Sequence, residues 1–483
     1  MPSPIRSFIN WIFIAAVAGI ILWREHAWQV RMRQVLDATA APVAATARVE
    51  GNESRLLENN AALQKQLVAA ESRLSSLTAE TNRLKQALEA AKPAPTPDSL
   101  AAQFKELRGL AFAPPPQWSP VPMQTILDNV RTRVEAQLPA ESSQARSRAA
   151  LAMGFHSEPF DYRGAVVSLA QMTSGGFYDA TANSFLYREE AALKRADGRE
   201  AFIGGLASAL TVLKAGNTGN LYDPADDDAA LALRSLMSGD ANASRVRFSL
   251  ADQLNLNFDK SGAPAAPPPN YSAPVFLAEI WKFSQDKGSQ FIEVLAGQGG
   301  NAAVDAAYAR PPKSSAEILH PELYQADPPF QPVPVTFAEP VIAGQSPYFT
   351  NVAGEIGSYI ALRSWLGVDE ATVASEGWAG DRYAIWPGEE GVGDHIFWKT
   401  VWRTEKDAQE FFDQMRRVIM QRFSIPWRKE YDAIANRFSV DDPRRIVRLK
   451  LESGTRTVTL GNATDSAFAA ALEAAAEKWS NTP

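Results

Sequence analysis

Cysteine is absent from the 483-residue chain. Without thiols the protein forms no disulfides, thiolate zinc sites or iron–sulfur clusters, and it has no cysteine nucleophile. Histidine is nearly absent too, since only His26, His156, His320 and His395 occur, and their spacing does not suit joint metal ligation by one helix. Acidic residues outnumber basic ones, 55 to 48, for a formal net charge of −7. This balance excludes a dedicated nucleic-acid binder, which needs a basic surface.

Common catalytic motifs are also missing. The chain has no HExxH, P-loop, GxGxxG or GxSxG pattern. What is present is a hydrophobic content of 46%, enough for a large core or several domains. Helical and strand-like segments follow one another without a βαβ rhythm, so we expect an α+β fold in which helix dominates.

The longest apolar run lies at the N-terminus. Residues Phe8 to Trp23 are apolar except for Asn10, which approaches the ~20 residues that span a bilayer. A cleaved signal peptide is the alternative, but Trp23-Arg24-Glu25-His26 follows the run instead of a small-residue cleavage site. The sequence therefore predicts a transmembrane anchor within residues 1–30. Arginines on both sides of the run leave its orientation open.

A heptad pattern occupies residues 45–92. Leucine or another apolar residue fills most seam positions over six heptads, and charged or polar residues stand between them. Such a narrow stripe is covered best by a partner helix, so we expect an oligomeric coiled coil. A single long helix packed on its own globular domain is the alternative. Residues 93–122 follow as a Pro-rich linker, because proline cannot continue the helix.

The remaining chain alternates helical and extended patterns. A polar turn between aromatic residues predicts a hairpin at Gly176–Tyr187, and Gly297–Gly300 is expected to break the helix that contains it. The other helices are expected at Met123–Gln137, Arg199–Lys214, Ala229–Ser249, Val275–Tyr308, Gly354–Leu366 and Lys406–Phe423. The other strands are expected at Tyr383–Trp386, His395–Trp402, Arg445–Leu451 and Thr455–Leu460.

Several short motifs occur in a fixed order along the body. They include Gly176-Phe177-Tyr178-Asp179, the His320-Pro-Glu run, Gly354-Glu355-Ile356-Gly357, Gly377-Trp378-Ala379-Gly380-Asp381-Arg382 and Asp407-Ala408-Gln409-Glu410-Phe411. With these, residues Leu107 to Val418 resemble a family of exported bacterial zinc-metallopeptidase-like proteins. The resemblance implies a metallopeptidase-like domain at 123–418 and leaves 419–483 as a C-terminal α/β extension. His320 itself is interpreted from its local sequence as a packed or capping residue.

The chain departs from this family at the positions of the metal ligands and the general base. Gly204 and Ser208 stand where the resemblance places two histidine ligands, and Ser238 stands at the third ligand. Gly205 replaces the glutamate that would act as general base. A zinc hydrolase needs three protein ligands and a base. The sequence therefore predicts a degenerate, catalytically inactive member that binds no metal and no other cofactor.

The expected function is that of a non-catalytic pseudo-peptidase binding protein of the cell envelope, held by its N-terminal helix in the inner membrane and presented on a self-associating stalk. The resemblance implies export, which places the body in the periplasm or outside the cell. The expected partner is a protein or peptide. A structural envelope scaffold is one alternative, and an enzyme using Glu355, Glu376 and Asp381 is another. An open groove beside Gly204 would favour peptide binding over scaffolding.

Overall fold

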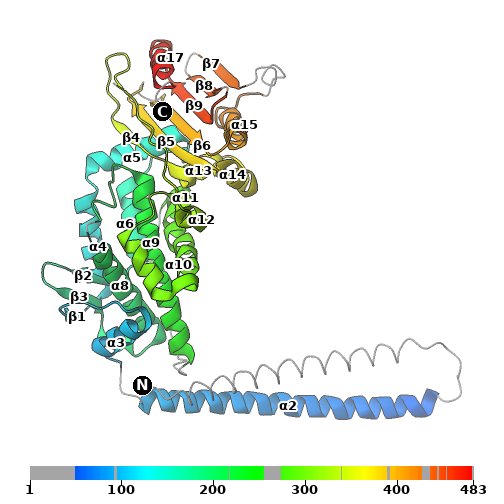
Figure 1. The fold of residues 1–483 in the computed structure, drawn as a ribbon. Coiled ribbons are helices and arrows are strands. Elements are labelled where there is room, and N and C mark those ends of the chain that lie inside the picture. The colour runs from blue at the N-terminus through cyan, green and yellow to red at the C-terminus, as the bar shows by residue number, and fades with distance from the viewer. Residues whose placement is uncertain are drawn as a thin grey trace. The chain divides into compact units, whose positions relative to one another are not determined.

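The structure is a computed structural model, and it describes residues 49–91, 95–216, 218–254, 273–338, 340–388, 392–426, 436–442, 445–452 and 454–480. The chain divides into two compact units, Met1–Leu84 and Lys85–Pro483. Helices dominate, and the strands form one three-stranded and one six-stranded sheet (Figure 1). The architecture is therefore α+β, as expected for the body.

The expected transmembrane helix requires correction. Among the described residues, no helix is both long enough and apolar enough to cross a bilayer. The longest of them, α2 (Val49–Ala91), carries charged and polar side chains throughout its length, whereas a membrane span needs about 20 predominantly apolar residues. The anchor predicted within residues 1–30 lies outside the described residues. The single-pass inner-membrane location, with the body in the periplasm or outside the cell, loses its support together with that helix.

Helix α2 fills most of the predicted heptad segment. It is one continuous helix, and every side chain from residue 60 to residue 83 is exposed. Leu63, Leu67, Leu74 and Leu77 are each about 60% exposed, at 59–65%. The described chain supplies no second helix to cover this stripe. Residues 49–91 therefore form one helix with an uncovered apolar stripe, and its self-association as a coiled coil stays a prediction.

The second unit begins with a helical body built around α9 (Asp227–Leu254). Helix α9 contacts α8 (Ala196–Ala215) along one side and α10 (Val275–Ala309) along another (Figure 1). The other helices of this body are α3 (Pro97–Arg108), α4 (Met123–Gln137), α5 (Ala140–Met153), α6 (Tyr162–Met172), α7 (Glu190–Leu193), α11 (Ser315–Leu319) and α12 (Pro321–Gln325).

Two glycines allow α9 and α10 to approach closely. A Cβ atom on Gly239 would lie 2.2 Å from the carbonyl carbon of Gly288, so the two backbones touch there. Leu236, Phe291 and Ile292 are fully buried beside this crossing. Helix α10 is interrupted at Gly299 and Gly300, as the sequence predicts, and Gly300 has a φ of +63° that favours glycine.

The smaller sheet contains the predicted hairpin. Its strands are β1 (Gln117–Val121), β2 (Gly176–Asp179) and β3 (Ser184–Arg188), in the order β1-β3-β2. β3 pairs in parallel with β1 and antiparallel with β2. Strand β2 therefore forms one edge of this sheet, on the side where α8 lies against it.

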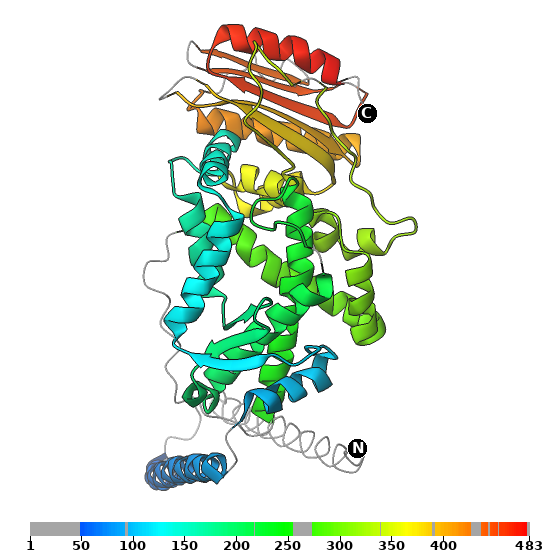
Figure 2. The same ribbon diagram turned by 90° about the vertical axis from the view of Figure 1, so that its left-hand side faces the viewer.

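The larger sheet is wholly antiparallel. Its order is β4-β5-β6-β9-β8-β7. The strands are β4 (Phe349–Asn351), β5 (Trp378–Trp386), β6 (His395–Trp402), β7 (Arg437–Asp442), β8 (Arg445–Leu451) and β9 (Thr457–Ala463). Figure 2 shows α15 (Glu405–Arg422) on one face of the sheet and α17 (Ser466–Ser480) on the other. Both faces of β5 and β6 are buried, which explains the aromatic-rich sequences of these two strands.

Two further helices, α13 (Gly354–Arg363) and α14 (Val368–Ser375), join this sheet to the helical body. Helix α13 contacts α9 and α11 on one side and β5 on the other. The domain boundary expected at residue 418 falls within α15, and strands from before and after it share the larger sheet. The two halves of that sheet therefore form one structural layer.

Candidate functional site

The segment Gly204–Leu210, where the resemblance expects a zinc helix, lies within α8. A Cβ atom on Gly205 would lie 2.4 Å from the backbone nitrogen of Gly176 and 2.7 Å from its Cα. No side chain fits at that distance, so glycine at position 205 lets the backbone of the hairpin rest directly on α8. This close packing offsets the roughly 1 kcal/mol that glycine costs in a helix interior.

A cavity of about 390 Å³ opens between β2, α4, α6, α8 and α9. A smaller cavity of about 110 Å³ adjoins it between α8, α9 and α10. The two share the lining residues Thr173, Ser208, Ser238 and Trp281. We refer to the combined space as the groove. Its volume suits a few residues of extended chain better than a whole folded partner.

Three expected metal-ligand positions meet in the groove. Gly204, Ser208 and Ser238 all line the smaller cavity, and Gly205 lines the larger one. The hydroxyl of Ser208 donates a hydrogen bond to the carbonyl oxygen of Gly204, 2.9 Å away. Across the described residues, no three His, Cys, Asp or Glu side chains gather closely enough to hold a metal ion. Two hydroxyls and two glycines do not fit a zinc ion, which prefers nitrogen, thiolate and carboxylate ligands.

Strand β2 presents its outer edge beside the groove. The carbonyl oxygen of Tyr178, on this edge strand, accepts a hydrogen bond of 2.6 Å from Arg133 Nη2. The guanidinium of Arg133 also lies 3.9 Å from the ring centroid of Phe177. An exposed strand edge can accept an extended peptide as an added strand through main-chain hydrogen bonds. The hairpin therefore brings a peptide-compatible edge to the groove.

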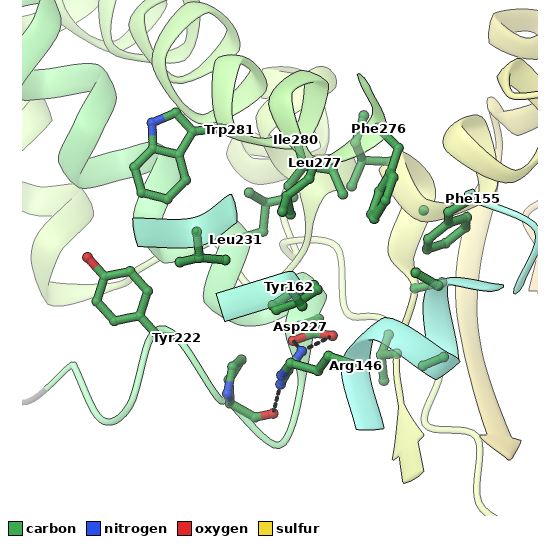
Figure 3. A pocket seen from close by; sticks show the side chains of 18 of the residues that line it. Arg146, Phe155, Tyr162, Tyr222, Asp227, Leu231, Phe276, Leu277, Ile280 and Trp281 are labelled. Atoms are coloured by element: carbon green, nitrogen blue, oxygen red, sulfur yellow. Dashed lines mark hydrogen bonds and ion pairs between the residues drawn. The ribbon is translucent and has the colours of Figure 1, made fainter. Parts of the chain in front are cut away.

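A third cavity, of about 110 Å³, is also lined by Trp281 (Figure 3). It shares Leu221, Tyr222, Arg234 and Trp281 with the groove. Much of its wall is aromatic or aliphatic, and its labelled apolar residues in Figure 3 include Phe155, Leu231, Phe276, Leu277 and Ile280. The cavity and the groove are thus neighbours joined at one junction.

An ion-pair cluster around the buried Arg146 forms the polar wall of this third cavity. Arg146 bonds Asp227 at 2.8 Å (Figure 3). It also bonds Asp223 at 2.9 Å and the carbonyl oxygen of Pro224 at 3.1 Å. Burial raises the pKa of Asp227, and Arg146 opposes that rise. No local sequence pattern marks Arg146 as a candidate site residue. Only its tertiary partners distinguish it from the other arginines of the chain.

A second cluster ties α3 to α9 and α10. Arg108 is 1% exposed and forms two bonds of 2.8 Å with Asp240. It also bonds Asp305 at 2.9 Å, and the hydroxyl of Tyr308 donates to Asp240. No local sequence pattern marks this cluster, because its members lie far apart along the chain. It fixes the helices that form the groove walls.

The motif residues of the hairpin have local roles. Asp179 Oδ1 accepts hydrogen bonds from the backbone nitrogens of Thr181 and Ala182, which closes the turn. The hydroxyl of Tyr178 donates to Asn183 Oδ1 at 3.0 Å. Tyr178 also lines the groove, whereas Asp179 does not.

His320 and Glu355 form a pair outside the groove. Their side chains approach to 2.7 Å, between the start of α12 and the first turn of α13. Glu355 Oε2 has no hydrogen-bond partner among the described residues. The hydrogen bond to the Glu355 carboxylate raises the pKa of His320 against the effect of burial. Burial raises the pKa of Glu355. This pair couples α12 to α13 through one hydrogen bond.

The motif around Trp378 is structural. Asp381 is buried and accepts four hydrogen bonds, from the backbone nitrogens of Ala353 and Gly354 and from the indoles of Trp378 and Trp398. Arg382 lies on β5 opposite Lys399 of β6. Because every bond to Asp381 comes from the protein, this carboxylate is engaged in holding α13 against the sheet.

A family model described as "Domain of unknown function (DUF8575)" matches residues 344–473. This range runs from just before β4 into α17, so it covers the larger sheet and none of the expected metal-ligand positions. The comparison with curated proteins found no match, and neither did the comparison with solved structures.

Proposed function

We propose that this chain is a non-catalytic peptide-binding protein, a zinc-metallopeptidase-like body without the metal, in which the groove receives an extended segment of a partner. The observation that carries the proposal is the position of the edge strand β2 beside a cavity of about 390 Å³. Strand addition supplies main-chain hydrogen bonds, and the adjoining cavity accepts side chains.

The proposed lack of peptidase activity rests on the groups present at the expected metal site. Gly204 and Gly205 offer no ligand or base, and the hydroxyls of Ser208 and Ser238 are poor zinc ligands. Ser208 is already engaged with the carbonyl oxygen of Gly204. The same residues leave room for a ligand, because small side chains keep the groove floor open.

The two alternatives from the sequence fit this geometry less well. A purely structural scaffold needs no groove beside Gly204, and a cavity lies there. An enzyme built on Glu355 and Asp381 needs carboxylates that reach a substrate. Asp381 instead accepts four protein hydrogen bonds, and Glu355 is 3% exposed.

Fluorescence anisotropy with a labelled pool of random decapeptides tests the proposal. The intact chain should bind the pool, and Ser208→Trp should abolish binding because its indole fills the groove floor. Val246→Trp is the matched control, since Val246 is 43% exposed on α9 and lines none of the three cavities. Far-UV circular dichroism establishes that both variants are folded. Equal binding by the two variants would place the peptide elsewhere.

Metal analysis and a hydrolysis assay separately test the proposed lack of zinc binding and of peptidase activity. We expect the purified chain to retain no stoichiometric zinc after dialysis against zinc followed by buffer. We also expect labelled peptides to remain intact during prolonged incubation. Stoichiometric zinc together with cleavage would establish an enzyme instead.

A further inference from the structure

The charged side chains that line the groove are all arginines, and one of them, Arg245, is paired with Glu200 outside the lining. Arg133 and Arg234 line its larger cavity and Arg245 lines the smaller one, while no Asp or Glu is among the described lining residues of either. This contrasts with the whole chain, whose formal net charge is −7. A concave surface that gathers cations in an acidic protein favours a ligand that carries negative charge.

Arg234 is the arginine at the junction of the groove and the third cavity. Its Nη2 donates to the carbonyl oxygen of Leu221 at 2.6 Å. No carboxylate among the described residues lies within ion-pair distance of Arg234. The nearby Asp227 is engaged through both oxygens by Arg146. Burial lowers the pKa of Arg234, as expected for a guanidinium that lacks a close anion.

Trp281 supplies a second donor at the same junction. It lines all three cavities, and its indole Nε1 is buried without a hydrogen-bond partner among the described residues. The guanidinium carbon of Arg234 is 6.0 Å from the Trp281 ring. In Figure 3 the indole nitrogen lies on the side of the ring away from Leu231. Leaving a buried donor unpaired is unfavourable, so an acceptor is expected to bind there.

From these contacts we infer that the groove selects acidic peptides, with one ligand carboxylate bound between the guanidinium of Arg234 and the indole N–H of Trp281. The inference rests on the proposed peptide-binding function and adds the class of ligand to it. A carboxylate can take two parallel hydrogen bonds from a guanidinium and a further one from an indole. Arg133, beside strand β2, adds a second positive charge along the path of the peptide.

The test uses fluorescence anisotropy of the intact chain with defined peptide pools. Each pool is a random labelled heptapeptide with a C-terminal amide and a fixed Glu, Gln or Lys at the centre. A fourth pool has a central Gln and a free C-terminal carboxylate. This last pool distinguishes a side-chain carboxylate from a chain terminus as the bound group. We expect one carboxylate-bearing pool to bind about tenfold more tightly than the central-Gln amide pool.

Variants identify the residues responsible. Arg234→Gln should reduce the carboxylate preference to less than about twofold, and Arg234→Lys should restore part of it. Trp281→Phe should weaken binding of the carboxylate-bearing pool about threefold, because this substitution removes the indole N–H. Binding of the central-Gln amide pool should not change. Arg131→Gln is the matched control. Arg131 is exposed on α4, two residues from Arg133, and lines none of the three cavities.

The outcomes separate this inference from the proposed function. If the Glu, Gln and free-carboxylate pools bind equally well, the inference fails while peptide binding stands. If no pool binds, both fail. Should Arg234→Gln not fold, the ranking of the pools by the wild-type chain and its response to Trp281→Phe still decide the question. The assignment would also be overturned if Trp281→Phe and Arg234→Lys both kept the full wild-type preference for the carboxylate-bearing pool.

Discussion

Asp381 illustrates how one residue can hold two parts of a fold together. Burial raises the pKa of Asp381 to about 6, and its four N–H donors oppose that rise. At neutral pH it is a carboxylate, and each oxygen accepts two hydrogen bonds. Asp381→Asn turns an acceptor oxygen into a donor that faces two other donors. We expect a loss of about 3 kcal/mol in the free energy of unfolding, measured by urea titration.

Asp286→Asn is the control for this substitution. Asp286 is 52% exposed, 3.7 Å from Lys282 on the same helix, and such surface pairs contribute little. Its stability should lie within about 0.5 kcal/mol of wild type. If the two variants are equally stable, Asp381 does not hold α13 against the sheet as we describe.

The His320–Glu355 pair predicts a pH dependence at the same scale. Both pKa values are raised in the folded chain, so the folded state holds these protons more tightly than the unfolded state. The stabilisation of the folded state by protonated His320 is therefore complete below the ordinary histidine pKa of 6.5. It is lost as pH rises through the raised pKa of His320. The difference in melting temperature between wild type and Glu355→Gln should therefore shrink as pH rises above the ordinary histidine pKa of 6.5.

Other charges near His320 are unchanged in that comparison. They are Glu322, 3.7 Å from His320 Nδ1, together with Arg403 and Glu376, which act on the pair through space. Their effects cancel between wild type and Glu355→Gln to first order. Melting curves that shift in parallel over the whole pH range would show that the pair does not titrate as described.

Helix α2 provides the prediction at the scale of one element. Its leucines are exposed along one stripe, and an apolar stripe of this period is buried best against a second copy of the same helix. Sedimentation equilibrium of the whole chain should therefore show an oligomer. Leu67→Asp combined with Leu74→Asp should yield a monomer, since both positions lie on the stripe. Ser72→Asp, on the same helix, should leave the oligomer intact.

A monomeric wild-type chain at micromolar concentration would remove this prediction. So would an oligomer that survives both leucine substitutions, because another surface would then make the contact. Far-UV circular dichroism of the double variant shows whether α2 remains helical when the stripe is charged.

At the scale of the molecule, the larger sheet and the helical body share one core. The cluster beneath α15 includes Met153 of α5, Leu362 of α13, Trp378 of β5 and Phe411 of α15, all buried. Residues in contact across elements unfold together, so we expect Lys85–Pro483 to unfold in one transition. Tryptophan fluorescence and far-UV circular dichroism should give the same midpoint.

A substitution in the core tests whether Lys85–Pro483 unfolds in a single transition. Phe411 is 1% exposed, and Phe411→Ala should cost about 3 to 5 kcal/mol and lower both midpoints equally. Val246→Ala, at an exposed position of α9, should change neither midpoint appreciably. Two separate transitions, with only one affected by Phe411→Ala, would mean that the sheet unfolds independently of the helical body.

The sequence by itself determined much of the local structure. Met123–Gln137 and His395–Trp402 are a helix and a strand with the predicted bounds, and the hairpin and the break at Gly299–Gly300 are where they were expected. Local apolar periodicity, turn residues and glycine all act over a few positions, so they can be read without knowing the partners. The single helix at α2 was likewise visible as a heptad pattern, although its partner was not.

Only the tertiary structure decided which residues meet. Arg146, Arg108 and Asp381 gain their roles from acceptors and donors that are distant in sequence. The three neighbours Asp226 to Asp228 have different surroundings: Asp226 caps α9, Asp227 pairs with Arg146, and Asp228 is 2% exposed. The convergence of Ser208, Ser238, Arg234 and Trp281 on one groove follows from the close packing of α8, α9 and α10. Such packing depends on long-range contacts, which no local pattern encodes.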